Sequence, residues 1–169
     1  MAAPFPDRQW GSRTGLLGRT LSAFAATDVG SALVHALGPL DRRVLERTQG
    51  RYTALGPVGA PVLLLKTTGR KSGQPRTTPL LYAHAGDVLY LVGSNFGGEH
   101  HPAWTSNLLA HPEAVITIAG ERIPVHTELL QDADRKAEVY AQFEQISQAY
   151  TAYRDRTSRD LRIFAVRRS

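Results

Sequence analysis

The sequence predicts an α+β protein whose mostly antiparallel sheet curls into a small barrel. Two observations support this fold class. Segments with strand periodicity follow one another through the middle of the chain and are joined by short turns. Helices dominate the flanks, and the strand–helix alternation of a parallel sheet is absent from the sequence. A chain of 169 residues corresponds to one domain with one sizeable core.

Two segments precede the predicted barrel. Residues 1–15 contain two prolines, two glycines and two arginines, which favours a flexible leader. Residues 16–50 form an N-terminal helical segment: residues 16–37 have the apolar spacing of an amphipathic helix, and residues 41–47 add a turn or two. The barrel domain is then expected over residues 51–169.

The first strands of the barrel follow a loop at residues 52–61 that is rich in glycine and proline. The continuous apolar run at residues 62–67 predicts a buried strand. Residues 77–83 and 88–92 flank a turn at residues 84–87, and this arrangement predicts a hairpin.

A second hairpin is predicted where residues 115–119 and 122–130 flank Gly120 and Glu121. In its second arm apolar and polar side chains alternate, which is typical of a strand with one buried face. Pro124 cannot donate a hydrogen bond to a neighbouring strand, so we expect an edge or a bulge at this position.

Two helices and a last strand complete the predicted fold. The short helix covers residues 102–110 and ends before Pro112. The longer helix covers residues 132–150, with Asp132 as its N-cap, because apolar residues recur there at spacings of three and four. The last strand is predicted over residues 161–166.

The composition excludes several kinds of site. The chain has no cysteine, which excludes disulfides, thiolate zinc sites, iron–sulfur clusters and a cysteine nucleophile. It contains no dinucleotide-binding or P-loop glycine motif, and Ser94 is one residue out of register for a nucleophile elbow. The histidines at positions 100, 101 and 111 lack the spacing of metal ligands, so no metal is expected.

The charges are segregated along the chain. Residues 47–86 carry six cations and no acid, whereas residues 87–150 carry three cations and nine acids. Uniform basicity favours nucleic acid, but segregation favours a local anion site, so no nucleic-acid partner is expected. The sequence shows no secretory signal and no apolar run of about 20 residues, which predicts a cytoplasmic protein.

The densest chemical signal is the segment between the first two predicted strands, residues 66–80. It combines two glycines, several hydroxyl groups and an amide with lysines and arginines. Glycine permits a close approach of the backbone to a ligand, and arginine offers a fork for phosphate or carboxylate. The segment therefore favours an anion site, with a solvated hairpin tip as the alternative.

A second signal is the glycine-rich loop that follows a strand and opens the short helix, residues 94–108. N–H groups at the start of such a helix favour anions or carbonyl oxygens. Trp104 and Asn107 are three residues apart and share a helix face, where a ring beside an amide suits a planar heterocycle. Packing of Trp104 in the core is the alternative.

Three strings of the sequence together resemble one family. They are TTGRKSGQPRTTPLLY, GSNFGGEHHPAWTSNLLAHPE and AYTAYRDRTSRDLRIFAV. They resemble the deazaflavin (coenzyme F420)-dependent nitroreductase family, which includes deazaflavin-dependent quinone reductases. The similarity extends from about residue 41 to residue 166. It implies an FMN-binding split-barrel-like fold with flanking helices, and an oxidoreductase that transfers hydride from reduced F420 (8-hydroxy-5-deazaflavin) to a quinone, enone or nitroaromatic acceptor.

The resemblance also implies which residues bind the cofactor and which face the acceptor. For the cofactor, the matching positions are Lys71 and Arg76 at the phosphate and acidic tail, Thr78 and Pro79 beside them, Val92, Gly93 and Ser94 near the ring, and Trp104 and Asn107 on the following helix. Tyr150 and Tyr153 match tyrosines that form a wall on the substrate side. Ser94 or Tyr150 would polarise the acceptor oxygen, and Tyr150 would supply a proton.

Several alternatives stay open at this stage. An FMN-dependent oxidase or reductase on a similar barrel would use the same kind of phosphate site. A non-catalytic carrier of deazaflavin, haem or a lipid would keep the loops without turnover. The N-terminal amphipathic helix either covers the barrel or makes peripheral contact with an anionic membrane at the inner face of the cell. The protein is a monomer or a homodimer.

Overall fold

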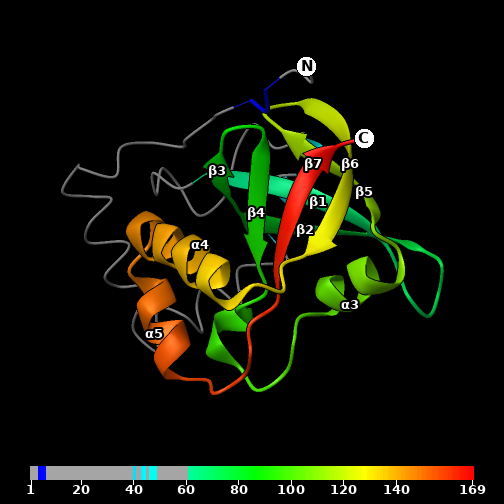
Figure 1. The fold of residues 1–169 in the computed structure, drawn as a ribbon. Helices are drawn as coiled ribbons and strands as arrows, with labels where there is room; N and C mark the ends of the chain where they lie inside the picture. Colours follow the sequence, from blue (N-terminus) through cyan, green and yellow to red (C-terminus); the bar gives the residue numbers. More distant parts are fainter. Residues whose placement is uncertain (1–3, 7–39, 41–42, 45, 49–60) are drawn as a thin grey trace.

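A computed structural model describes residues 4–6, 40, 43–44, 46–48 and 61–169 (Figure 1). Its strands and helices are β1 (Val62–Thr68), β2 (Pro75–Leu81), β3 (Ala83–Ala85), β4 (Val88–Val92), η1 (Asn95–Gly97), α3 (Ala103–Ala110), β5 (Glu113–Ile118), β6 (Glu121–Leu129), α4 (Ala133–Ile146), α5 (Ala149–Asp155) and β7 (Ile163–Arg168). The prediction of an α+β fold with a mostly antiparallel, curled sheet is confirmed.

All seven strands belong to one sheet, in the order β2-β1-β5-β6-β7-β4-β3. The two strands at the ends of this order, β2 and β3, are consecutive in the chain, with only Tyr82 between them. A covalent link between opposite edges requires the sheet to curl back on itself (Figure 1). Strand β7 lies inside the sheet, paired with β6 on one side and β4 on the other.

The curled sheet has an apolar cluster on each face. One cluster lies on the inner face and contains Leu89, Leu91, Phe164 and the helix α3 residue Trp104. The other lies between the outer face and the helices α4 and α5, and Tyr90 belongs to it. Because successive side chains of a strand point to opposite faces, β4 contributes to both clusters, and all of its residues are buried.

The predicted hairpins are confirmed, with one correction. The first arm of the first hairpin is interrupted at Tyr82, so β2 pairs with β1 and only β3 pairs with β4. The β6 strand alternates between buried and exposed positions, as its sequence predicts. The pairing of β6 with β7 begins at Val125, and Ser169 N donates to Pro124 O at 3.2 Å. Pro124 therefore lies at the end of the region in which β6 is paired with both β5 and β7.

The helix predicted over residues 132–150 is in fact two helices. Asp132 is the N-cap, as predicted, and its Oδ1 accepts from Arg135 N at 2.7 Å. Helix α4 ends at Ile146, because Ser147 is extended (φ −151°, ψ 126°). Tyr150 therefore belongs to α5, which runs beside α4 (Figure 1).

The N-terminal predictions fall mostly outside the described residues, and the helix at residues 16–37 lies wholly outside them. In the turn predicted at residues 41–47, every described residue is helical. Within the predicted leader, Phe5 is 4% exposed and belongs to the inner apolar cluster. Arg168 Nη2 donates to Pro4 O at 3.2 Å, so at residues 4–6 the chain is packed against the sheet and not free.

Candidate functional site

Residues 69–76, here called the basic segment, comprise the turn between β1 and β2 and the first two residues of β2. Its turn is closed by backbone hydrogen bonds from Gly69 N to Gln74 O and from Gly73 N to Gly69 O, both 2.8 Å long. Gly73 has a φ of +66°, a conformation that glycine adopts without strain. The turn presents the side chains of Arg70, Lys71 and Arg76 to solvent, and all three residues are exposed.

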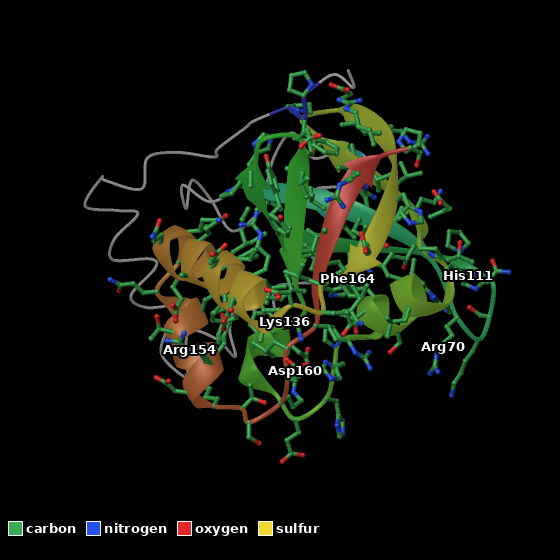
Figure 2. The ribbon with its side chains drawn as sticks, in the orientation of Figure 1. Arg70, His111, Lys136, Arg154, Asp160 and Phe164 are labelled. Atoms are coloured by element: carbon green, nitrogen blue, oxygen red, sulfur yellow. The ribbon has the colours of Figure 1, made fainter. Side chains whose placement is uncertain are left out.

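The cations of the basic segment lack counter-charges. In the described part of the chain, no carboxylate forms an ion pair with them. By contrast, the cations on the α4, α5 and β7 side include several that pair with acids: Arg135 with Glu138, Lys136 with Asp160, Arg154 with Glu144, Arg167 with Glu128 and Arg168 with Glu121. In Figure 2, Lys136 lies next to Asp160, whereas Arg70 is at the right of the view, on the side of helix α3. Unpaired cations on a closed turn are suited to an anion.

Asn107 attaches the basic segment to helix α3. Its Oδ1 accepts from Arg70 N at 3.0 Å, and its Nδ2 donates to Thr67 Oγ1 at 3.0 Å. The residue is only 8% exposed, its bond to Thr67 is buried and its bond to Arg70 is partly buried. The amide predicted to bind cofactor therefore also has a structural task, which is to fix the conformation of the cation-bearing turn.

Two further predicted cofactor residues lie on β2, next to the basic segment. Thr78 and Pro79 are half-buried and stand opposite Leu65 and Leu64 of β1. Trp104 has a different environment from the one its predicted role suggests. It is 5% exposed and its ring lies 5.7 Å from the ring of Phe164, so the core-packing alternative describes its position.

Strand β4 ends at the second group of predicted residues. Val92 is its last residue, and Gly93 N donates to Arg162 O at 2.8 Å. A Cβ on Gly93 would lie 2.7 Å from Thr105 Cγ2, so only glycine lets this strand end and helix α3 approach so closely. Ser94 follows, and it is 7% exposed.

The structure brings together the three residues predicted to act on the acceptor. Hydrogen bonding by the Ser94 side chain opposes the rise in the pKa of the Tyr150 hydroxyl that burial causes. The Tyr150 and Tyr153 rings lie 5.5 Å apart, and the Tyr153 ring lies 5.6 Å from that of Phe96. Like any tyrosine, Tyr150 is protonated at neutral pH, and burial raises its pKa further.

The residues directly after Ser94 have unusual backbone angles. Asn95 (φ +48°) and Phe96 (φ +56°) are both left-handed without being glycine, and Gly97 (φ +77°) follows. A Cβ on Gly97 would lie 2.9 Å from Tyr153 O and 2.8 Å from Arg156 Cβ. Such strain persists only where the surroundings enforce it, and it is concentrated at functional sites. We call residues 94–98 the serine turn.

Sequence reasoning missed three residues around the serine turn, namely His101, Arg159 and Arg162. The basic character of residues 154–162 was the only available signal. Arg162 Nη1 donates to Thr105 Oγ1 at 3.1 Å and to Ser106 Oγ at 3.2 Å. Burial, followed by the positive charges of Arg162 and Arg159, lowers the pKa of His101 below 6.5.

Two further features are absent from the part of the chain that the structure describes. It contains no group of three or more His, Cys, Asp or Glu side chains arranged to hold a metal ion. It also contains no helix that is long and apolar enough to cross a membrane.

Comparisons with known proteins agree on one family. The profile of the F420H(2)-dependent quinone reductase family matches residues 40–168. The chain is 38% identical over 126 residues to the F420H(2)-dependent quinone reductase Rv1261c of Mycobacterium tuberculosis, covering 72% of this chain and 83% of that protein.

Solved structures show the same fold. The chain resembles an F420-H2 dependent reductase (FDR-A) with a TM-score of 0.57 and 27% identity, over 63% of this chain and 93% of the other. It also resembles a protein described as a domain-swapped dimer, with a TM-score of 0.59 and 25% identity, over 79% of this chain and 98% of the other.

Proposed function

Because the chain belongs to the F420H(2)-dependent quinone reductase family, we propose that it transfers a hydride from reduced coenzyme F420 to an electron-poor acceptor of the quinone class. The observation that carries this proposal is the basic segment. Its cations have no carboxylate partner in the described part of the chain, and Asn107 fixes its turn on α3. A cofactor with a phosphate and an acidic tail supplies the missing negative charge.

The residues present fit this cofactor. Lys71 and Arg76 would bind the phosphate and acidic tail, one as a point charge and the other as a fork. Thr78 and Pro79, next to them on β2, would line the same site. Further positions complete the proposed set: Val92, Gly93 and Ser94 near the ring, and Trp104 and Asn107 on α3. For the last two the proposed role is indirect, since Trp104 is packed in the core and Asn107 holds the turn.

Bound reduced F420 supplies the hydride, that is, two electrons with one proton. This chain's own residues then handle the acceptor. We place the acceptor at Ser94, Tyr150 and Tyr153. The Tyr150 hydroxyl is protonated at neutral pH, and burial raises its pKa further, so it can donate a hydrogen bond to the acceptor carbonyl and stabilise the negative charge that hydride addition creates there. The hydride and one further proton, taken up at the oxygen that carries this charge, together convert the quinone to the hydroquinone, in which both carbonyls have become hydroxyls.

Fluorescence titration with oxidised F420, followed by anaerobic turnover of reduced F420 with a soluble benzoquinone, tests the proposal. We expect saturable binding and stoichiometric recovery of the oxidised cofactor. Tight binding of F420 without turnover would identify a carrier. Turnover with reduced FMN but not with reduced F420 would identify the flavin enzyme, and mass spectrometry of the ligand retained on purification distinguishes haem or lipid from both.

Two finer parts of the proposal concern partners. The amphipathic segment of residues 16–37, with Arg13 and Arg19 beside its apolar face, would suit contact with an anionic membrane that holds a lipid-soluble quinone. Co-sedimentation with anionic liposomes at low salt tests this contact, and its absence favours the alternative that the helix covers the barrel. Light scattering decides between monomer and homodimer.

A further inference from the structure

Arg159 donates hydrogen bonds to three acceptors around the serine turn. Its Nη2 donates to Ser94 O at 2.9 Å, and its Nε donates to Gly98 O at 2.9 Å. Its Nη1 lies 3.0 Å from His101 Nδ1. Because a guanidinium can only donate, Nδ1 of His101 must be the acceptor, and the proton of the neutral ring is then on Nε2. One side chain thus contacts both ends of the serine turn and the loop that leads to α3.

The turn between these contacts is the strained part of the chain. Asn95 and Phe96 are left-handed, and only two short backbone bonds close the turn, from Gly97 N to Ser94 O (3.0 Å) and from Gly98 N to Asn95 O (2.9 Å). A left-handed conformation costs free energy in a residue other than glycine, and it costs more in Phe96 than in Asn95. The contacts of Arg159 offset this cost, because its fork spans the turn from its first carbonyl to its last.

The segment that carries Arg159 is itself fixed. The next residue, Asp160, accepts two hydrogen bonds from Lys136 Nζ on α4, at 2.8 and 2.7 Å (Figure 2). The Lys136 side chain is 16% exposed, so this ion pair is largely shielded on the lysine side. Arg159 N also donates to Thr157 Oγ1 at 3.3 Å. The guanidinium therefore projects from a supported position toward the serine turn.

From this geometry we propose that Arg159 is a positioning residue. It holds the serine turn in its left-handed conformation and thereby keeps Ser94 in place against Tyr150. The inference rests on the proposed function, because Ser94 and Tyr150 are the residues placed at the acceptor. Arg159 touches neither cofactor nor acceptor in this scheme, and it acts through the backbone of residues 94–98.

Hydrogen–deuterium exchange of the ligand-free protein tests the positioning role independently of turnover. The probes are the Gly97 and Gly98 amides, whose bonds close the turn. In Arg159→Gln we expect these amides to exchange at least about tenfold faster, because the open turn becomes more populated. Arg167→Gln is the matched control, since Arg167 is an exposed β7 residue whose acid partner, Glu128, lies 3.6 Å away. Unchanged exchange in Arg159→Gln would overturn the proposal.

Steady-state kinetics and cofactor titration complete the test. We expect kcat in Arg159→Gln to fall about tenfold or more, whereas the Kd for F420, set by the basic segment, changes less than about threefold. Arg159→Lys should behave like the glutamine variant, because an ammonium cannot span the three acceptors. Full rescue by lysine, or faster exchange with an unchanged kcat, would overturn the positioning role. Absence of turnover in the unsubstituted protein counts against the proposed function alone, and the exchange result then decides on Arg159.

Discussion

The basic segment and the serine turn are both loops at strand ends, but they are built in opposite ways. The cations of the basic segment are exposed, and two bonds from Asn107 attach its turn to the rest of the fold. The serine turn is strained, closely packed on α5 and held by Arg159. The exposed cations are thus held by few contacts, whereas the turn that carries Ser94 is held by many.

Two glycines provide the largest expected contrast between these regions. Gly97 and Gly73 both have positive φ, but a Cβ on Gly97 meets backbone atoms at 2.9 Å, and a Cβ on Gly73 meets nothing within 4 Å. We expect Gly97→Ala to lower the free energy of unfolding by about 3 kcal/mol or more, and Gly73→Ala by about 1 kcal/mol. Urea denaturation measures both, and equal losses would show that the two turns are equally tolerant.

The affinity for the cofactor tests the proposed role of the basic segment. Lys71→Ala and Arg76→Ala should each weaken F420 binding by about 1.5–3 kcal/mol, because each removes a charge-assisted hydrogen bond. Their free energies of unfolding should stay within about 0.5 kcal/mol of the unsubstituted value, since both side chains are exposed.

Fluorescence titration at increasing salt measures the affinity, which should fall as ions screen the site. Arg167→Ala is the control, because it removes a distant exposed cation. Native affinity in the Lys71→Ala, Arg76→Ala double variant would place the anion site elsewhere.

Removal of the Tyr150 hydroxyl tests the buried residues beside the serine turn. Tyr150→Phe keeps the ring contacts with Phe143 and Tyr153 but loses the group that faces Ser94. We expect kcat to fall about tenfold, which corresponds to about 1.4 kcal/mol of transition-state stabilisation, with an unchanged Kd for F420. Loss of cofactor without loss of turnover in the remaining complex would assign Tyr150 to cofactor binding.

The smallest expected effect is a pH dependence that arises at His101. Its pKa is lowered in the folded protein, chiefly by burial, so the unfolded chain binds more protons below pH 6.5. Stability therefore falls as the pH decreases from 6.5 toward the lowered pKa, and it is unaffected by this group at higher pH. The His101→Asn variant keeps an acceptor for Arg159 but has no titrating ring. Its thermal unfolding midpoint should therefore depend less on pH than that of the unsubstituted protein. Identical pH profiles would contradict this assignment.

Much of the fold follows from local patterns. The β1, β4, β5 and β6 strands were predictable because their apolar runs and alternation follow the two-residue period of a strand. The end of α4 was not predictable from the sequence. Tyr150 continues the apolar spacing of Val139 and Phe143, although the chain leaves the helix at Ser147, which is extended. The interruption at Tyr82 was missed for a similar reason, as β2 and β3 read as one strand until their different partners are known.

The candidate site likewise has one part that the sequence predicts and another that only the structure shows. The cations of the basic segment stand out in the sequence because their type and spacing carry the chemistry. The contacts of Asn107 and Arg159 link residues 37 to 65 positions apart, and several of their partners are backbone groups, which every residue has. No residue pattern marks such a contact, so these roles could only come from the structure.

The position of β7 inside the sheet has a consequence for the order of folding. The β1–β2, β3–β4 and β5–β6 pairs connect neighbours in the chain, whereas the second partner of β4, which is β7, lies more than seventy residues further along the chain. Non-local pairing closes a long loop and is slow. Two groups reach the serine turn only when β7 docks. They are the Arg162 carbonyl, which accepts from Gly93 N, and the Arg159 guanidinium. We therefore expect the serine turn to acquire its structure in the final step of folding, together with the closure of the sheet.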